Sequence, residues 1–141
     1  MPAHILLVED EPDLRLAMRV RLGAAGFDCE TASNGKEGLE QIAKRRPDLI
    51  VTDLLMSVMD GYDFVRRLKA DPETATIPLI VMTALPEHAR AARAEELRGV
   101  IVLERPFELP DIVSMIRALL ERSTQGGPID ARSKNDPRRG R

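Results

Sequence analysis

The sequence has a single cysteine, Cys29, among its 141 residues, so an intramolecular disulfide is impossible. A chain without disulfides suits a reducing compartment, and a lone cysteine in an apolar stretch is usually a small core residue. Aromatic residues make up only 3% of the chain, so the core must be aliphatic. No apolar run reaches membrane-spanning length, and the N-terminus lacks a signal-peptide pattern. These absences predict a soluble, cytoplasmic protein with no membrane partner.

The chain also lacks an excess of charge of either sign. The chain has 21 basic and 23 acidic residues, and its net charge of −2 gives no indication of direct nucleic-acid binding. Its two histidines, His4 and His88, lie far apart in the sequence, which gives a zinc site little support. The length fits one domain better than two.

Short apolar runs alternate with longer helical patterns along most of the chain. We expect strands over residues 5–8, 27–32, 48–52, 78–83 and 100–103. The helical patterns begin at residue 12, follow the turn at 33–35, surround 64–68, run from 86 to 97, and repeat over 109–120. The strands are continuously apolar, as in parallel sheets covered by helices on both faces. The pattern predicts a doubly wound (βα)₅ fold of the α/β class.

The last segment differs in composition from the rest. We place the domain at residues 1–122 and a tail at 123–141, which holds five basic residues, two acids and one large apolar residue, Ile129. Such a segment buries too little apolar surface to order itself, so we expect a solvated tail. The alternative is a basic arm for an acidic partner.

Acidic residues collect where the expected strands end. In open parallel sheets, ligands bind beyond the carboxyl ends of the strands, at the point where the strand order reverses. If the sheet order is 2-1-3-4-5, the ends of the first and third strands are neighbours, and Glu9, Asp10 and Asp53 share one crevice there. Clustered carboxylates repel one another unless a cation intervenes, and Mg²⁺ suits a site with few carboxylates. For Glu11 and Asp13, which fall in the first turn of a helix, we expect capping instead.

A carboxylate in such a crevice can act as a nucleophile toward phosphorus. Phosphoryl transfer chiefly requires neutralisation of charge on the phosphoryl oxygens. The ends of the neighbouring strands offer a hydroxyl at Thr83 and a cation at Arg105. Together with Asp53 and a metal ion, these groups form a complete phosphoryl-binding set.

The same residues carry a family resemblance that covers residues 4 to about 122. The matching segments are 5–12, 47–56, 59–62, 80–84 and 105–107, in this order on the (βα)₅ pattern. The sequence resembles a response-regulator receiver domain of two-component signalling. The resemblance implies a flavodoxin-like three-layer sandwich with sheet order 2-1-3-4-5 and a cis bond before Pro106.

The resemblance also implies a role for each site residue. Asp53 is the phosphoacceptor, and Asp10 binds Mg²⁺ or Mn²⁺ directly. Glu9 binds the metal directly or through water, and the backbone carbonyl of Leu55 is a further ligand. Thr83 is the hydroxyl that turns toward the phosphoryl group.

Partners follow from the resemblance as well. The phosphoryl donor would be a sensor histidine kinase or a histidine phosphotransfer protein. The chain ends soon after its last expected helix, so we expect no output domain. Output would then come through an unknown downstream protein on the surface of residues 86–97, 100–103 and 109–120, and a homodimer is possible. Arg90, Arg93 and Arg98 lie on this surface, although they also fit a solvated helix face with i,i+3 and i,i+4 ion pairs.

The sequence departs from the family pattern at several positions. Arg105 stands where the family has Lys, and a planar guanidinium is not equivalent to a compact ammonium. Val102 replaces the usual aromatic, and Ser57 replaces a common proline. Leu55 and Leu85 are apolar where polar groups in the family help to place the attacking water, which predicts slow self-dephosphorylation.

Three functions compete for these observations. The first is a phosphorylated switch, which catalyses only its own phosphorylation and dephosphorylation and is otherwise not an enzyme. The second is a pseudo-receiver, a binding module that is not phosphorylated, suggested by Arg105 and Val102. The third, an aspartate-dependent phosphatase, lacks the second Asp that such enzymes carry, because that position is Leu55.

Overall fold

Five short segments form one parallel sheet in the computed structural model, which describes residues 2–126 of the chain. The strands are β1 (His4–Val8), β2 (Asp28–Ala32), β3 (Leu49–Asp53), β4 (Leu79–Thr83) and β5 (Ile101–Glu104). Their order is β2-β1-β3-β4-β5, and every neighbouring pair is parallel. The predicted strand order and fold class are confirmed.

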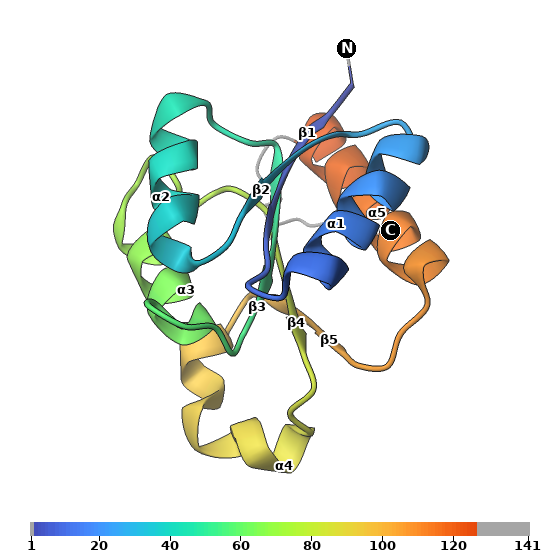
Figure 1. Cartoon of the computed structure of the whole chain (residues 1–141). Coiled ribbons are helices and arrows are strands. Elements are labelled where there is room, and N and C mark those ends of the chain that lie inside the picture. The colour runs from blue at the N-terminus through green and yellow to red at the C-terminus, as the bar shows by residue number, and fades with distance from the viewer. Residues whose placement is uncertain (1, 127–141) are drawn as a thin grey trace, which may run out of the picture.

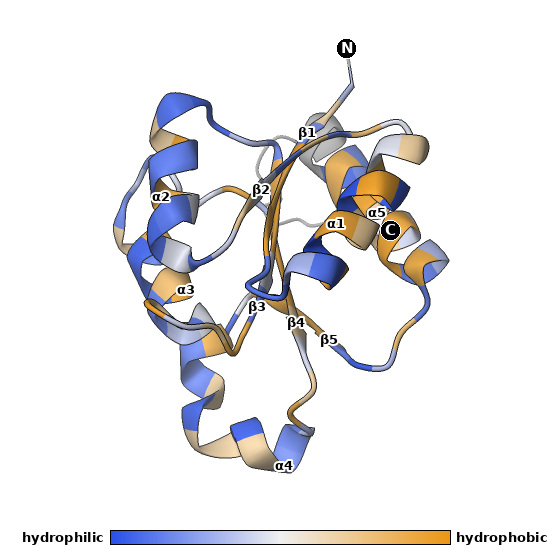
Figure 2. Ribbon diagram, in the orientation of Figure 1, coloured by the Kyte–Doolittle hydropathy of each residue, from blue (hydrophilic) through white to orange (hydrophobic). Residues whose placement is uncertain are grey.

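Helices cover both faces of this sheet (Figure 1). They are α1 (Pro12–Ala24), α2 (Gly35–Lys44), α3 (Gly61–Ala70), α4 (Glu87–Arg90), the 3₁₀ segment η1 (Ala91–Leu97) and α5 (Leu109–Gly126). In Figure 1, α1 and α5 lie on one face, and α2 and α3 lie on the other. Figure 2 shows hydrophobic strands between the helices and mostly hydrophilic residues on α2 and α3, whereas α1 also exposes Leu16 and Val20. The result is the expected three-layer sandwich.

The core explains why β1, β3 and β4 are mostly apolar. The expectation of continuously apolar strands is wrong for β2, an edge strand that carries Asp28, Glu30 and Thr31 and is mostly half-buried. Ile5 and Leu7 of β1 belong to the cluster between the sheet and α1 and α5. Leu6 and Val8 of the same strand belong to the cluster against α2 and α3. Successive side chains of a strand point to opposite faces, so a strand covered on both sides buries every residue.

The first helix begins immediately after the acidic end of β1. Glu11 is its N-cap, and the Glu11 side chain accepts a hydrogen bond of 2.6 Å from the backbone N–H of Leu14. Pro12 fills the first helical position, where a missing N–H costs nothing. The capping role expected for Glu11 is confirmed, and the cap holds the chain direction directly after Asp10.

The segment expected as one helix over residues 86–97 is not a single α-helix. The short helix α4 gives way to η1, and Arg93 has non-helical angles of φ −119° and ψ 21°. The guanidinium of Arg93 lies 3.8 Å from the centre of the Tyr62 ring. Lys69 donates hydrogen bonds to the carbonyls of Glu96 and Arg98. These contacts with α3 outweigh the local helical pattern, because helix propensity is a weak preference.

The last helix reaches Gly126, beyond the domain end expected at residue 122. The remainder of the predicted tail, 127–141, lies outside the described residues. Within residues 2–126, no helix combines the length and the apolar content needed to cross a membrane.

Candidate functional site

Three carboxylates meet at the carboxyl end of the sheet, as the sequence predicts. Glu9 and Asp10 follow β1, and Asp53 ends β3, which pairs with β1 in the register Val8↔Thr52. One ligand oxygen from each of the three acids lies within 4.8 Å of the other two. Carboxylate oxygens grouped this closely are typical ligands of Mg²⁺.

Glu9 is the buried member of the cluster, with 1% of its surface exposed. Its Oε2 accepts a hydrogen bond of 3.1 Å from the N–H of Glu11, and its Oε1 accepts one of 2.8 Å from Nη2 of Arg105. Burial raises the pKa of Glu9 above its ordinary value, and the negative charge of Asp53 raises it further. The N–H of Glu11 and the guanidinium of Arg105 lower this pKa in part. Ionised Glu9 therefore depends on a nearby cation.

Asp53 is oriented by the backbone that follows it. Its Oδ1 accepts hydrogen bonds from the N–H groups of Leu54 at 2.7 Å and Leu55 at 3.3 Å. Its Oδ2 faces Nη2 of Arg105 at 3.4 Å. One carboxylate oxygen of Asp53 is thus held by the chain, and the other faces the shared cation.

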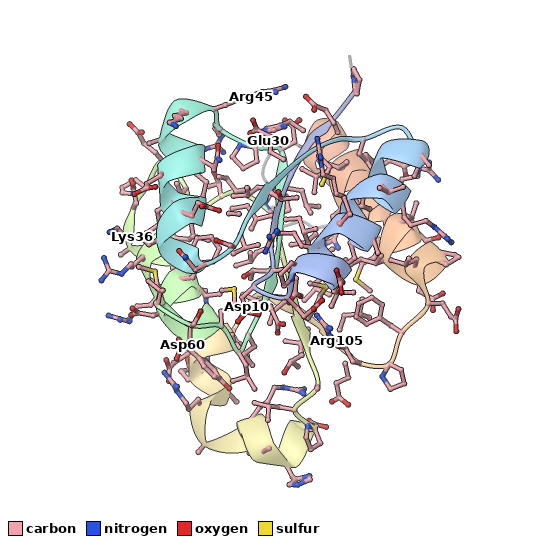
Figure 3. The ribbon with its side chains drawn as sticks, in the orientation of Figure 1. Asp10, Glu30, Lys36, Arg45, Asp60 and Arg105 are labelled. Atoms are coloured by element: carbon pink, nitrogen blue, oxygen red, sulfur yellow. The ribbon has the colours of Figure 1, made fainter. Side chains whose placement is uncertain are left out.

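Arg105 reaches the site, which the sequence could not decide. Its backbone N–H donates to the carbonyl of Thr83 at 2.8 Å and so ties the end of β5 to β4. The peptide bond to Pro106 is cis, in agreement with the expectation from the family. Figure 3 shows Asp10 and Arg105 at the same end of the sheet.

Thr83 is fully buried at the end of β4. In the register of the sheet, Asp53 of β3 is paired with Met82 of β4. Thr83 is the next residue of β4, one position beyond the partner of Asp53. The Oγ1 of Thr83 accepts a hydrogen bond of 3.0 Å from the N–H of Leu85. In this state the hydroxyl is bound to the loop after β4 rather than to Asp53.

Gly61 is a site residue whose purpose sequence reasoning missed. A Cβ on Gly61 would lie 2.5 Å from the carbonyl oxygen of Asp53 and 2.5 Å from Cα of Leu54. The N–H of Gly61 donates to the carbonyl of Leu54 at 2.7 Å. The start of α3 therefore packs directly against the loop that follows Asp53. The sequence signal was the segment 59–62, which matches the family pattern but does not by itself show what Gly61 contacts.

Arg90 also has a role that the sequence did not indicate. Its Nη1 donates to the carbonyl of Leu85 at 2.6 Å and to Oε2 of Glu104 at 3.0 Å, and its side chain is only 13% exposed. The solvated-face alternative is thus wrong for Arg90. The ion pairs of that alternative are confirmed for Arg93 and Arg98, which pair with acidic residues three positions away. The helix face is not, because Arg93 stacks on Tyr62 and Arg98 lies beyond the end of η1.

Comparison with known proteins decides the family. The family model described as the response regulator receiver domain matches residues 5–117. The chain belongs to this family. It is a receiver domain of two-component signalling with a flavodoxin-like fold, and such domains interact with histidine kinases or phosphotransfer proteins.

Individual relatives agree with this assignment of the receiver domain. The phosphate regulon transcriptional regulatory protein PhoB of Rhizobium meliloti (strain 1021) is 32% identical over 123 residues, which is 87% of this chain and 54% of the relative. The receiver domain of a signal transduction histidine kinase from Syntrophus aciditrophicus is 32% identical, with a TM-score of 0.80 over 94% of this chain and 97% of that chain. A receiver domain protein from Clostridium thermocellum is 26% identical, with a TM-score of 0.76 over 86% and 97% of the two chains. The chain spans about half the length of the curated relatives that it matches.

Proposed function

We propose that this receiver domain is a switch that accepts a phosphoryl group on Asp53 from a histidine kinase or a histidine phosphotransfer protein. The observation that carries the proposal is the meeting of Glu9, Asp10 and Asp53 within 4.8 Å at the ends of adjacent strands. Glu9, Asp10 and Asp53, with the carbonyl of Leu55, would hold Mg²⁺ or Mn²⁺. The metal would neutralise charge on the transferring phosphoryl group.

The residues around Asp53 have complementary parts in this transfer. The N–H groups of Leu54 and Leu55 orient the carboxylate through Oδ1, which leaves Oδ2 to attack phosphorus. The new O–P bond replaces the P–N bond of the donor phosphohistidine, whose imidazole leaves. Arg105, 3.4 Å from Oδ2, offers donors for the phosphoryl oxygens.

The response would reach the surface through Thr83. In the present structure the Thr83 hydroxyl accepts a hydrogen bond from the N–H of Leu85. This bond would break when the hydroxyl turns to the phosphoryl group. Arg90 connects the carbonyl of Leu85 to Glu104, so the loop after β4 would move together with the end of β5. We infer that a downstream protein reads the face formed by α4, η1, β5 and α5. Beyond its own phosphorylation and dephosphorylation we expect no catalysis, and we expect action in the cytoplasm without direct nucleic-acid binding.

The pseudo-receiver is the second candidate. One observation favours it, namely that Arg105 already pairs with Glu9 and Asp53 and supplies a cation to the site. In that case the domain would bind partners without modification of Asp53.

Incubation with Mg²⁺ and acetyl phosphate, followed by intact-protein mass spectrometry, separates the two candidates. The switch predicts one added phosphoryl group in the wild type and in Asp111→Asn, which alters an exposed aspartate on α5. It predicts no addition in Asp53→Asn or in the presence of EDTA. Absence of modification with acetyl phosphate and with a panel of phosphorylated histidine kinases would favour the pseudo-receiver.

A further inference from the structure

Arg105 holds two of the three carboxylates that the proposed metal would need. Its Nη2 lies 2.8 Å from Oε1 of Glu9 and 3.4 Å from Oδ2 of Asp53. Asp10 forms no hydrogen bond or ion pair with any residue that the structure describes. The guanidinium therefore bridges the inner part of the cluster and leaves only its outer member open.

Both oxygens of Glu9 are engaged in this state. Oε2 accepts from the N–H of Glu11, and Oε1 accepts from Arg105. A divalent cation bound close to Oε1 would meet the guanidinium at short range, and like charges at such a separation repel strongly where water is excluded. The two cations cannot both use this oxygen in the geometry observed.

We propose that Arg105 is an internal cation that competes with the divalent metal for Glu9 and Asp53 and thereby sets the metal affinity of the resting domain. The inference rests on the metal site of the proposed function and adds a regulator to it. Occupation of the site by metal would release the guanidinium from the carboxylates and make it available to the phosphoryl oxygens.

The surroundings of Arg105 suit a side chain that changes partners. Among the described residues, its guanidinium hydrogen-bonds only to the two carboxylates, and its buried Nε has no hydrogen-bond partner. The side chain is 26% exposed, so solvent is open to part of it. The ring of Phe107 is 6.0 Å from the guanidinium carbon, at the limit of a cation–π contact. The two ion pairs are therefore the main attachment of the head group.

The length of arginine matters for this competition. Its Nη2 reaches both acids at once, and a lysine ammonium, although it carries three protons, lies on a shorter side chain. A lysine at the same position is shorter and more strongly hydrated, and its flexible stem loses more freedom for each bond formed. We expect Arg105→Lys to compete less well than the wild type while keeping the charge.

Direct metal binding tests the inference without phosphorylation. Free Mn²⁺ is measured by electron paramagnetic resonance during titration of the wild type, Arg105→Gln, Arg105→Lys and Arg15→Gln, all at the same pH. Arg15 is the matched control, because its Nη1 donates to the backbone carbonyl of Glu9 at 2.9 Å and not to a carboxylate of the cluster. Arg105→Gln removes both ion pairs, and loss of the shorter pair, with Glu9, is by itself enough to predict about tenfold tighter Mn²⁺ binding. The Mn²⁺ affinity of Arg105→Lys should lie between those of the wild type and Arg105→Gln. Arg15→Gln should change the Mn²⁺ affinity by less than about threefold.

Thermal unfolding provides a readout that does not depend on the metal titration. Without metal, Arg105→Gln should unfold at a lower temperature than the wild type, because Glu9 and Asp53 lose their shared cation. Saturating Mn²⁺ should raise the unfolding temperature of Arg105→Gln more than that of the wild type. Circular dichroism confirms that each variant is folded before titration.

The possible results are distinguishable. Equal or weaker Mn²⁺ binding by folded Arg105→Gln overturns the inference, and so does equal tightening by Arg15→Gln, which would indicate a general field effect. If Arg105→Gln binds Mn²⁺ more tightly but Asp53 is never modified, the inference stands and the proposed function fails. Absence of Mn²⁺ binding by every variant overturns both.

Discussion

Gly61 provides a sharp test of how closely α3 approaches the end of β3. The substitution Gly61→Ala adds one methyl group at the first residue of the helix. That carbon would lie 2.5 Å from the carbonyl oxygen of Asp53 and 2.8 Å from that of Leu54. Because both neighbours are backbone atoms, no side chain can rotate away to make room.

The magnitude follows from two opposing terms. Forced overpacking usually costs about 1–3 kcal/mol, and a clash with backbone lies at the upper end of that range. Alanine recovers at most about 1 kcal/mol of helix propensity relative to glycine. We therefore expect Gly61→Ala to lower the free energy of unfolding by about 2 kcal/mol. With a urea dependence of about 2 kcal/mol per molar, the midpoint falls by about 1 M.

Urea unfolding monitored by circular dichroism measures this change, and Gly23→Ala is the matched control. A Cβ on Gly23, near the end of α1, would have no atom within 4 Å, so the same substitution should stabilise the protein by about 0.5 kcal/mol. The two variants thus predict shifts of opposite sign. A midpoint for Gly61→Ala within about 0.2 M of the wild type would refute the close approach described here.

Three further predictions concern the loop after β3, the lone thiol and the lifetime of the phosphoryl group. Val58 has φ 69° and is 77% exposed, so Val58→Gly should raise stability by about 0.5 kcal/mol in urea unfolding; Val58→Ala, which keeps a Cβ, should not. Burial raises the pKa of Cys29 to about 11 from an ordinary 9.0, so the folded protein should resist iodoacetamide at pH 8 and react only when denatured. The Cys29 thiol ionises at a lower pH in the unfolded chain than in the folded protein, so the free energy of unfolding should fall as the pH rises from 9.0 toward about 11. Rapid labelling of the folded protein contradicts both statements. Leu55 is 52% exposed beside Asp53, and Leu55→Asn should shorten the lifetime of phosphorylated protein severalfold in a decay assay, whereas an unchanged rate would remove Leu55 from the explanation of slow decay.

The strand ends show how far sequence reasoning reached. Each apolar run marked a strand, and the acids after the first and third runs marked the crevice. The reversal of strand order between β1 and β3 then brought Glu9, Asp10 and Asp53 together. These inferences succeeded because strand burial, helix capping and the location of sites at strand ends depend on local pattern and topology.

Other features depend on atoms that are far apart in the chain. The break between α4 and η1 arises where Arg93 stacks on Tyr62 and Lys69 binds the carbonyls of Glu96 and Arg98. Arg90 turns inward to Glu104, although its sequence neighbours suggest a solvated helix face.

The sequence by itself determined the fold class and the acids that follow the first and third strands, since these follow from the periodicity of apolar residues and from what ends each strand. The strand order, which brings those acids together, was implied by the family resemblance and not by the residue pattern. Only the tertiary structure decided that Arg105 bridges Glu9 and Asp53, and that Gly61 leaves no space for a methyl group. The physical reason is that a long side chain can point in many directions, and a close backbone approach leaves no periodic mark. Both are settled by packing between segments that the chain brings together only on folding.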